Sequence, residues 1–300
     1  MKITRILCIV LALLTSLSAL AAVPETDRSG NAISVPAEIN RVISLAPAST
    51  QVLEDLGLLD KLVGVDNTSQ FYVDGVSELP QFDMMAVDIE RIAALEPDLV
   101  LTSGMSYLDG DPFAMLKQMG ICVADIPSSA SIADVKEDVL FTAALFGMEE
   151  EGRKLVDEMQ KTIDEIAAIG ATITDKKSVL FEIACLPYIY SFGSGTFLHE
   201  MIEIIGAENV LGHIVSWVAV NEEDAVASNP DVILTNVNYI EDSVGEILSR
   251  AGWEAVTAVA NRAVSYIDNG ASSLPNHRIV DALVEMAVAV YPEEYAAFAK

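Results

Sequence analysis

Basic residues are scarce in this chain. Its 300 residues include 17 Lys and Arg against 45 Asp and Glu, which gives a formal net charge of −28 at pH 7. Proteins that hold nucleic acid or an anionic membrane surface need Lys and Arg to neutralise phosphate groups. The shortage therefore excludes nucleic acid as a partner, and it favours a neutral or cationic ligand over a polyanion.

Cysteine is also rare, with three residues in all. Cys8 lies in an amino-terminal apolar run, which leaves Cys122 and Cys185 in the rest of the chain. An exported protein could join such a pair in a disulfide. The two residues fall in different halves of the sequence, however, and we expect two buried free thiols.

Long apolar runs are absent after the first residues. The stretch MKITRILCIVLALLTSLSALAA, residues 1–22, has Lys2 and Arg5 at its start, then an apolar run, then small residues. This order is typical of a secretory signal peptide. The run holds ~15 apolar residues, fewer than the ~20 that cross a bilayer. We therefore expect cleavage near Ala21 or Ala22, export, and a soluble protein in the periplasm.

Motifs that would indicate an enzyme are missing too. The sequence has no Ser nucleophile elbow, no H-E-x-x-H helix, no phosphate-binding loop and no paired-cysteine metal motif. Its three histidines, His199, His213 and His277, lack the spacing of metal ligands. We predict a protein without catalytic residues, without a metal site and without an intrinsic cofactor. The alternative of another class is an exported, metal-dependent enzyme that uses these histidines.

What the sequence does have is a regular alternation of short apolar runs and amphipathic segments. The apolar runs predict buried strands, and the segments between them predict helices that end at Gly or before Pro. Predicted strands cover 41–47, a segment that ends at Val65, 98–103, 121–127, 178–184, 231–236 and 263–268, and predicted helices cover 49–57, 89–95, 111–120, 196–206, 221–229 and 244–256. We expect Ser49 or Thr50 to cap the first helix and residues 66–87 to form a loop. The alternation predicts an α/β fold with mostly parallel sheets.

One helix-to-strand unit occurs twice. IERIAALEPDLVLTSG, residues 89–104, is echoed by NEEDAVASNPDVILTNV, residues 221–237. In each copy a glutamate, Glu90 or Glu223, precedes a Pro-Asp pair by seven positions, and the Asp is followed by three aliphatic residues and a Thr. The repetition predicts two similar lobes, each starting this helix with a glutamate.

A long amphipathic segment lies between the two copies. Within residues 149–170 apolar side chains recur at spacings of four, four and three, from Leu155 to Ile166. This is the period of one helix with a wet, acidic outer face, and ~20 residues of it span ~30 Å. We predict a stiff bridge between an amino-terminal lobe at 23–148 and a carboxy-terminal lobe at 171–300, with a ligand cleft between the lobes.

The loops that should face this cleft are rich in aromatic residues and methionine. Such residues give a ligand a large apolar contact area, and the same loops have no cluster of Arg or Lys. The candidates are Phe71, Tyr72, Phe82, Met84, Met85, Met105, Tyr107, Pro187, Tyr188, Tyr190, Trp217 and Tyr239. Each of them alone could equally pack in a core, but together they predict a large, partly apolar ligand.

Two long stretches resemble a known family. TDRSGNAISVPAEINRVISLAPASTQVLEDLGLLDKLVGVD, residues 26–66, is similar to the family's opening signature, and SLPNHRIVDALVEMAVAVYPEEY, residues 273–295, is similar to its closing helix. The family is that of the substrate-binding proteins of ABC importers for cobalamin and iron chelates, in which one helix bridges two lobes. The resemblance covers nearly the whole chain after the leader.

The resemblance implies a docking role for the echoed glutamates. In the cobalamin-binding member of the family, one glutamate on each lobe docks onto arginines of the membrane permease, and these two match Glu90 and Glu223. The partners implied are therefore the ABC permease and its ATPase. The alternative is that both residues only complement the helix dipole, a surface effect of ~0.3–1 kcal/mol.

The resemblance also implies ligand contacts. A tryptophan that lines the cobalamin pocket of that member matches Trp217, which stands six residues before Glu223. Met84 and Ser103 fall at roughly the places of its other pocket tryptophans, and Gln51 stands where family members commonly have Glu. With the loop candidates, the predicted ligand-binding residues are Tyr72, Phe82, Met84, Ser103, Tyr107, Tyr188, Trp217 and Tyr239.

These observations predict an exported, non-enzymatic and monomeric receptor that captures cobalamin or a related corrinoid and delivers it to the permease. A ferric siderophore or haem is the alternative ligand within the same family. A metal oxyanion is disfavoured by the shortage of basic residues in the cleft loops. The stiff bridge predicts that the lobes rock only slightly when a ligand binds.

Overall fold

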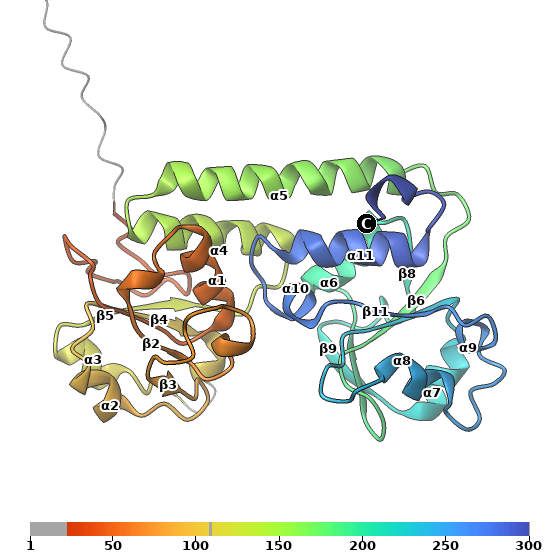
Figure 1. Cartoon of the computed structure of the whole chain (residues 1–300), viewed down its shortest axis with the longest axis horizontal. Coiled ribbons are helices and arrows are strands. Elements are labelled where there is room, and N and C mark those ends of the chain that lie inside the picture. Colours follow the sequence, from red (N-terminus) through yellow and green to blue (C-terminus); the bar gives the residue numbers. More distant parts are fainter. Residues whose placement is uncertain (1–22, 108–109, 300) are drawn as a thin grey trace, which may run out of the picture.

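The computed structural model describes residues 23–107 and 110–299. It shows two lobes side by side beneath one long helix, α5 (Glu149–Gly170) (Figure 1). The predicted signal peptide, residues 1–22, lies outside the described residues. Within the described part of the chain, no helix is both long and apolar enough to cross a membrane.

The amino-terminal lobe is built on a five-stranded parallel sheet in the order β3-β2-β1-β4-β5. Its strands are β1 (Val42–Ser44), β2 (Leu62–Asp66), β3 (Gln81–Phe82), β4 (Leu99–Ser103) and β5 (Cys122–Ile126), and its helices are α1 (Pro47–Asp55), α2 (Ile89–Ala94), α3 (Ala114–Gln118) and α4 (Ile132–Leu145). Helices cover both faces of this sheet, with α1 and α4 on one side and α2 and α3 on the other (Figure 1).

The aliphatic strands of this lobe are buried from both sides. In β4, Leu99 and Leu101 pack toward α1 and α4, whereas Val100 packs toward α2 and α3. Alternate side chains of a strand point to opposite faces, so a continuous apolar run is what a doubly covered parallel sheet requires. The predicted strands at 98–103 and 121–127 are confirmed on this basis.

Local capping explains most helix starts. Asp88 caps α2, and Ser131 caps α4 in a capping box with Asp134. The expected cap of the first helix is wrong, because α1 begins earlier with Pro47 in its first turn and without a side-chain cap. Proline suits this position since its missing N–H has no partner there in any case. Thr50 is buried within the helix instead.

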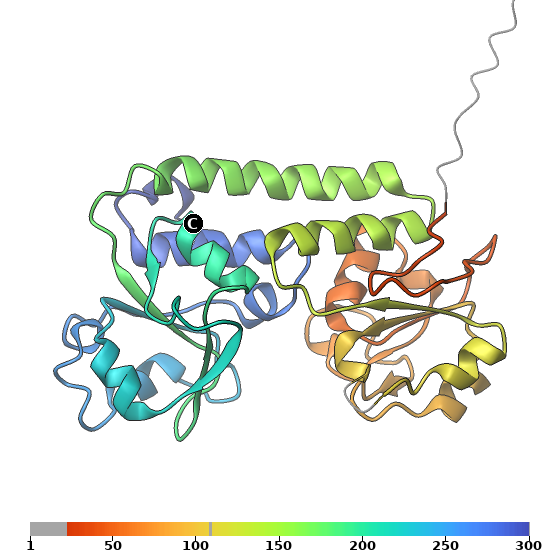
Figure 2. The same cartoon turned by 180° about the vertical axis from the view of Figure 1, so that it is seen from behind.

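Helix α5 matches the predicted amphipathic segment and lies over α4 and over α11 (Ile279–Val290), one for each lobe (Figure 2). Met159, Ile163 and Ile166 of its apolar stripe are buried. At Gly152 the helices come so close that an added Cβ would stand 2.5 Å from the Cβ of Ala143 in α4. This close packing holds α5 rigidly against α4.

The carboxy-terminal lobe has a four-stranded parallel sheet in the order β11-β10-β6-β8 and a separate antiparallel pair, β7 and β9. The strands are β6 (Ser178–Glu182), β7 (Ile189–Phe192), β8 (Glu208–Asn209), β9 (Trp217–Val220), β10 (Val232–Thr235) and β11 (Val264–Tyr266). The helices before α11 are α6 (Phe197–Ile204), α7 (Glu222–Ser228), α8 (Ser243–Leu248), α9 (Thr257–Ala260) and α10 (Asn269–Ser273). The predicted α/β class with mostly parallel sheets is confirmed.

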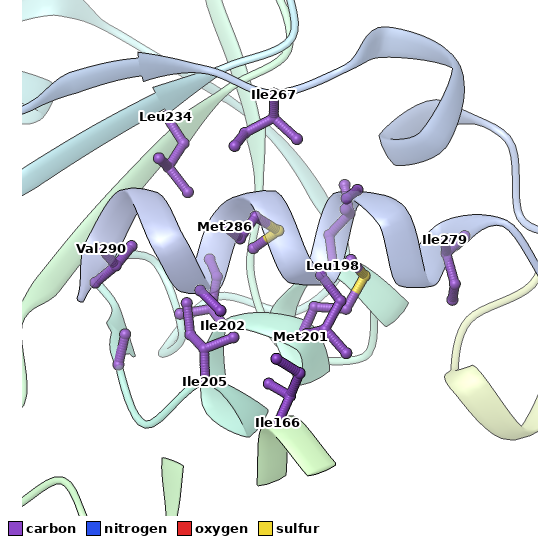
Figure 3. Close-up of a cluster of buried hydrophobic side chains, with 14 of the residues drawn as sticks. Ile166, Leu198, Met201, Ile202, Ile205, Leu234, Ile267, Ile279, Met286 and Val290 are labelled. Atoms are coloured by element: carbon purple, nitrogen blue, oxygen red, sulfur yellow. The ribbon is translucent and has the colours of Figure 1, made fainter. Parts of the chain in front are cut away.

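The core of this lobe surrounds α11, which is apolar on most sides. Figure 3 shows Met286 of α11 between Leu234 and Ile267 on the sheet side and the α6 side chains on the other. Ile166 of α5 joins the same cluster, so the bridging helix is anchored in this core. Each such buried side chain stabilises the fold by ~1.5–3 kcal/mol relative to an exposed one.

Several short elements differ from the sequence prediction. The segment 66–87, expected as a loop, contributes β3, because Gln81 and Phe82 pair with the end of β2. The pair β7 and β9 lies in segments where no strand was predicted, and the helix expected at 111–120 is shortened to α3. Short 3-10 helices occupy Leu59–Lys61, Ser69–Phe71, Gly104–Tyr107 and Ala296–Phe298.

Candidate ligand-binding cleft and docking helices

The echoed sequence unit forms the same structure in both lobes. In the amino-terminal lobe α2 leads into β4, and in the carboxy-terminal lobe α7 leads into β10 (Figure 1). Each helix begins at a capping side chain: Asp88 accepts the backbone N–H of Arg91 at 3.0 Å, and Asn221 accepts that of Asp224 at 2.8 Å. The predicted repetition of one helix-to-strand unit is confirmed.

The Pro-Asp pair of each copy has a structural role. The residue before each proline has a positive φ, 46° in the first copy and 42° in the second, which ends the helix and turns the chain toward the strand. Asp98 Oδ2 accepts the backbone N–H of Arg41 at 2.9 Å, and Asp231 Oδ2 accepts the backbone N–H of Ser178 at 2.8 Å. Each aspartate thus ties the start of its strand to the start of the neighbouring one.

The echoed glutamates differ from the rest of the unit. The side chains of Glu90 and Glu223 are exposed, and neither side chain forms a hydrogen bond or ion pair with another described residue. Their chain neighbours are anchored instead: Arg91 donates to a backbone carbonyl at 2.8 Å, and Trp253 Nε1 donates to Glu222 Oε1 at 2.9 Å. The fold fixes the two helices but leaves both glutamates available to a partner.

A cavity of about 400 Å³ lies between the lobes. One wall comes from the start of α1, the loops after β3, β4 and β5, and α4, while the other comes from β7, β9, α6 and the segment before α11. The lining residues are Ala46, Pro47, Ala48, Ser49, Val52, Met84, Ser103, Met105, Ile126, Pro127, Ser128, Ser129, Asp138, Val139, Thr142, Tyr190, Phe197, Trp217, Ser273, Leu274 and Pro275. The predicted cleft between the lobes is confirmed.

Aromatic and thioether side chains form part of the apolar wall. Strand β9 places Trp217 opposite Phe192 of β7, and the two rings meet edge to face with centroids 6.0 Å apart. This contact holds the indole while leaving it 40% exposed at the cavity. Tyr190 is exposed to a similar extent, and Met84 and Met105 line the cavity from the other lobe. The wall suits a large, flat, apolar ligand surface.

The polar part of the wall centres on a buried acid. Asp138 Oδ1 accepts from Arg28 Nε at 2.6 Å, and its Oδ2 accepts from the Ser129 hydroxyl at 2.8 Å. Burial raises the pKa of Asp138, although the Arg28 guanidinium acts in the opposite direction. No Lys, Arg or His occurs among the described residues that line the cavity. An anionic ligand would therefore meet a carboxyl group there and no cation.

Three predicted ligand contacts, Met84, Ser103 and Trp217, line the cavity. The sequence pattern gave no sign of Ser129 or Asp138. An acid in a helix such as α4 is normally taken for a solvent-facing residue, whereas contacts with Arg28 and Ser129 of the same lobe hold this one inward.

Three other predicted contacts in the amino-terminal lobe lie away from the cavity wall. Phe82 is 3% exposed in the core, with the Arg91 guanidinium 5.0 Å from its ring centroid, because β3 draws it into the sheet. Tyr107 packs against the same core, and its hydroxyl lies 3.3 Å from Thr102 Oγ1. Tyr72 donates its hydroxyl across the lobes to an asparagine of α10 at 2.8 Å.

The last two predicted contacts are on the surface of the carboxy-terminal lobe. Tyr188 is 79% exposed and Tyr239 is 61% exposed, and neither lines the cavity. The backbone N–H of Cys185 donates to the Tyr239 hydroxyl at 3.1 Å. Cys185 is partly exposed, so the expectation of two buried thiols is wrong for this residue; Cys122 is buried, which raises its pKa to about 11.

The histidines are dispersed. His199 lies on α6 near Asn209, His213 is exposed, and His277 contacts Asp55. No group of His, Cys, Asp and Glu side chains in the described ranges is placed to hold a metal ion. The histidines therefore form no common site in this part of the chain.

A polar contact joins the lobes next to the cavity. Arg278 Nη2 lies 2.7 Å from Glu54 Oε2, and Arg278 Nε donates to Asp55 Oδ2 at 2.8 Å. Asn276 donates to Gln51 Oε1 at 2.7 Å. We call it the α1 contact, and its members are Gln51, Glu54, Asp55, Asn276, His277 and Arg278.

The geometry is that of a two-lobed α/β binding protein with its site between the lobes. Residues 42–271 match the family described as periplasmic binding protein, and the chain belongs to this family. The uncharacterised ABC transporter substrate-binding lipoprotein YvrC of Bacillus subtilis is 30% identical over 273 residues, which cover 90% of this chain and 85% of the relative.

Two further comparisons concern proteins with a stated ligand. A cobalamin-binding protein of Halobacterium salinarum is 27% identical over 281 residues, covering 90% of this chain and 74% of that protein. The solved structure of a possible iron-binding periplasmic protein from Staphylococcus epidermidis superposes with a TM-score of 0.73 at 28% identity, covering 84% of this chain and 99% of that one. The chain is accordingly a substrate-binding protein of an ABC transporter.

Proposed function

We propose that the cavity captures cobalamin or a related corrinoid for import. The observation that carries this proposal is the wall itself, which offers aromatic and thioether surface but no Lys, Arg or His among the described lining residues. A corrinoid presents a flat ring with neutral amide groups at its edge, so the ring needs no cationic partner. The cobalamin-binding relative is in keeping with this ligand class.

Anionic ligands fit this wall less well. Haem and many ferric chelates carry carboxylates or other charged oxygens, and burying such a group without a partner is costly. A small oxyanion meets the same difficulty and would leave most of the cavity empty. Haem is the second candidate, because the Tyr190 phenol and the Met84 thioether are side-chain types that ligate haem iron and both line the cavity.

Parallel titrations of the purified protein with cobalamin, haem and a ferric siderophore test the proposal. We expect calorimetry to show sub-micromolar binding of cobalamin and weaker binding of the other two. Haem bound more tightly, with an iron absorption band that changes in Tyr190→Phe, would replace the corrinoid by haem. Binding of none of the three would refute the proposed ligand classes while leaving the transport family unchanged.

The exposed glutamates support a second part of the proposal. We infer that the exported receptor works as a monomer in the periplasm, without catalytic activity, and that Glu90 and Glu223 dock onto basic residues of the permease. Helices α2 and α7 lie at the ends of the lobes farthest from α5 (Figure 1), so one flat partner can reach both. Residues 149–170 serve as the bridge between lobes at 23–148 and 171–300.

Charge reversal tests the docking. In liposomes that contain the permease and its ATPase, we expect Glu90→Arg with Glu223→Arg to abolish the stimulation of ATP hydrolysis while ligand affinity stays unchanged. Glu151→Arg with Glu158→Arg, at two exposed positions of α5, makes the same change of charge far from α2 and α7, and this protein should behave as the unmodified protein. Normal stimulation by the doubly reversed protein would show that docking uses other residues.

A further inference from the structure

Asp138 has no role in the import scheme described so far. It lies on α4, its side chain is 7% exposed, and it is the one acidic residue among the described residues that line the cavity. A surface acid would need no explanation in so acidic a chain. A buried one does, because removing a carboxylate from water is costly unless it has hydrogen-bond donors.

The donors that hold Asp138 leave part of it unused. Arg28 Nε occupies one carboxylate oxygen and the Ser129 hydroxyl occupies the other. A carboxylate has about four acceptor positions, so each oxygen retains capacity for a further donor. Ser129 also lines the cavity. The Asp138 carboxylate therefore presents a fixed, oriented hydrogen-bond acceptor at the polar side of the ligand site.

Arg28 itself does not line the cavity. Its Nη1 is 2.7 Å from Glu137 Oε2, which is 62% exposed, so the guanidinium bridges an inner and an outer acid. The cation is thus held behind Asp138, where it keeps the carboxylate in place without meeting the ligand. The face that the ligand meets is acidic.

We propose that Asp138 is a specificity-determining residue that accepts a hydrogen bond from an amide N–H at the edge of the ligand and rejects ligands with a carboxylate there. The inference rests on the proposed corrinoid function and sharpens it. A primary amide donates to a carboxylate in a charge-assisted bond, whereas two carboxylates repel each other. The site thereby separates amidated corrinoids from their carboxylic precursors and from haem propionates.

The test compares two corrin rings that differ in these groups. Cobinamide carries amides at the ring edge, and cobyrinic acid carries carboxylic acids at the same positions. We expect the purified protein to bind cobinamide at least about tenfold more tightly at pH 7.5, which corresponds to about 1.4 kcal/mol. In Asp138→Asn this ratio should shrink about tenfold, because the side-chain amide can also donate to a carboxylate.

Matched variants separate the local effect from general charge. Glu137→Gln removes an acid one residue away that binds the same Arg28, and it should leave the ratio unchanged. If Asp138→Asn does not fold, because Arg28 loses part of its pairing, the double variant with Arg28→Gln removes both charges, and the ratio should again shrink.

Two results would contradict the proposal in different ways. Equal binding of the two corrins by the unmodified protein, or an unchanged ratio in Asp138→Asn and in the double variant, overturns the role of Asp138 and leaves the corrinoid function in place. Binding of neither corrin by the unmodified protein refutes the corrinoid function, and the role of Asp138 falls with it.

Discussion

Two of the places where the lobes face each other are of opposite character. At the α1 contact, charged and polar groups are bonded directly, with 2.7 Å between Arg278 and Glu54 and between His277 and Asp55. Around the cavity the walls are largely apolar, and no hydrogen bond between described lining residues joins one lobe to the other. The first place is closed by the protein itself, and the second is left for a ligand to fill.

Helix α1 takes part in both places. Its first turn, from Pro47 to Ser49, lines the cavity, and its last turn carries Glu54 and Asp55. A helix of nine residues moves as a rigid body. When the lobes tilt about the α1 contact, the first turn of α1 therefore moves together with its last turn, and the cavity wall moves with it. We therefore expect a small rocking motion on ligand binding and no wide hinge opening.

The largest expected effect comes from a substitution in the apolar wall of the cavity. Trp217→Ala removes the indole that Phe192 holds at the cavity, and with it the largest aromatic contact available to a corrinoid. We expect the affinity for cobalamin to fall roughly 30-fold or more, about 2 kcal/mol, as for other buried aromatic anchors of binding sites. Calorimetric titration measures the change.

A matched control on the same lobe is available. Tyr188→Ala also removes an aromatic ring, but this ring is 79% exposed and does not line the cavity. The affinity of the Tyr188→Ala protein for cobalamin should equal that of the unmodified protein. Equal losses in Trp217→Ala and Tyr188→Ala would mean that the ligand lies outside the cavity described above.

The fold could be predicted from the sequence wherever one periodicity decided the structure. The apolar stripe from Leu155 to Ile166 specified α5, and the doubly covered run at 98–103 specified β4. The sequence was less informative for β7 and β9, because an antiparallel pair of four residues each at a lobe surface depends on contacts between distant segments. Trp217 lies in that pair. It was indicated as an aromatic residue of a cleft-facing loop and by its resemblance to a family residue, but not by the period of a strand.

The candidate site was predictable only in part for a related reason. Met84 and Ser103 were indicated by resemblance and do line the cavity, whereas Phe82 was assigned to the ligand and lies in the core. An aromatic residue in an irregular segment carries no sign of which way it points until its neighbours are placed. Asp138 shows the reverse case, an acid that packing turns inward.

A smaller effect is expected from a substitution in the α1 contact. Arg278→Gln leaves Glu54 and Asp55 without their cation, and each of these side chains is 26–30% exposed, so water compensates in part. We expect a loss of about 1–2 kcal/mol in the free energy of unfolding, and a small increase in the radius of gyration in solution scattering. Urea titration measures the first quantity.

The scattering result decides what the α1 contact does. Lys161→Gln breaks an exposed ion pair on the outer face of α5, where the nitrogen and oxygen are 3.9 Å apart, and it should change neither quantity. An Arg278→Gln protein that loses stability but keeps its radius of gyration would show that α5 alone sets the spacing of the lobes.

The smallest expected effect is a dependence of the α1 contact on pH. Burial lowers the pKa of His277 below its ordinary value of 6.5, although Asp55 acts in the opposite direction. The folded state therefore favours the neutral ring, and its stabilising contribution is complete above pH 6.5 and declines as the pH falls below that value. Although burial raises the pKa of Asp55, Arg278 and His277 together hold it below 3.8, so this group contributes to stability down to about pH 4.

The pH window between 7.5 and 5 thus isolates His277 from Asp55. We expect the urea midpoint of the unmodified protein to fall across this window by more than that of His277→Asn, because the unfolded chain gains a proton that the buried ring resists. His213→Asn, a change at an exposed histidine, should keep the full dependence. If His277→Asn keeps the full pH dependence as well, other groups cause the pH response. The contrast between the α1 contact and the cavity would then rest on Arg278 alone.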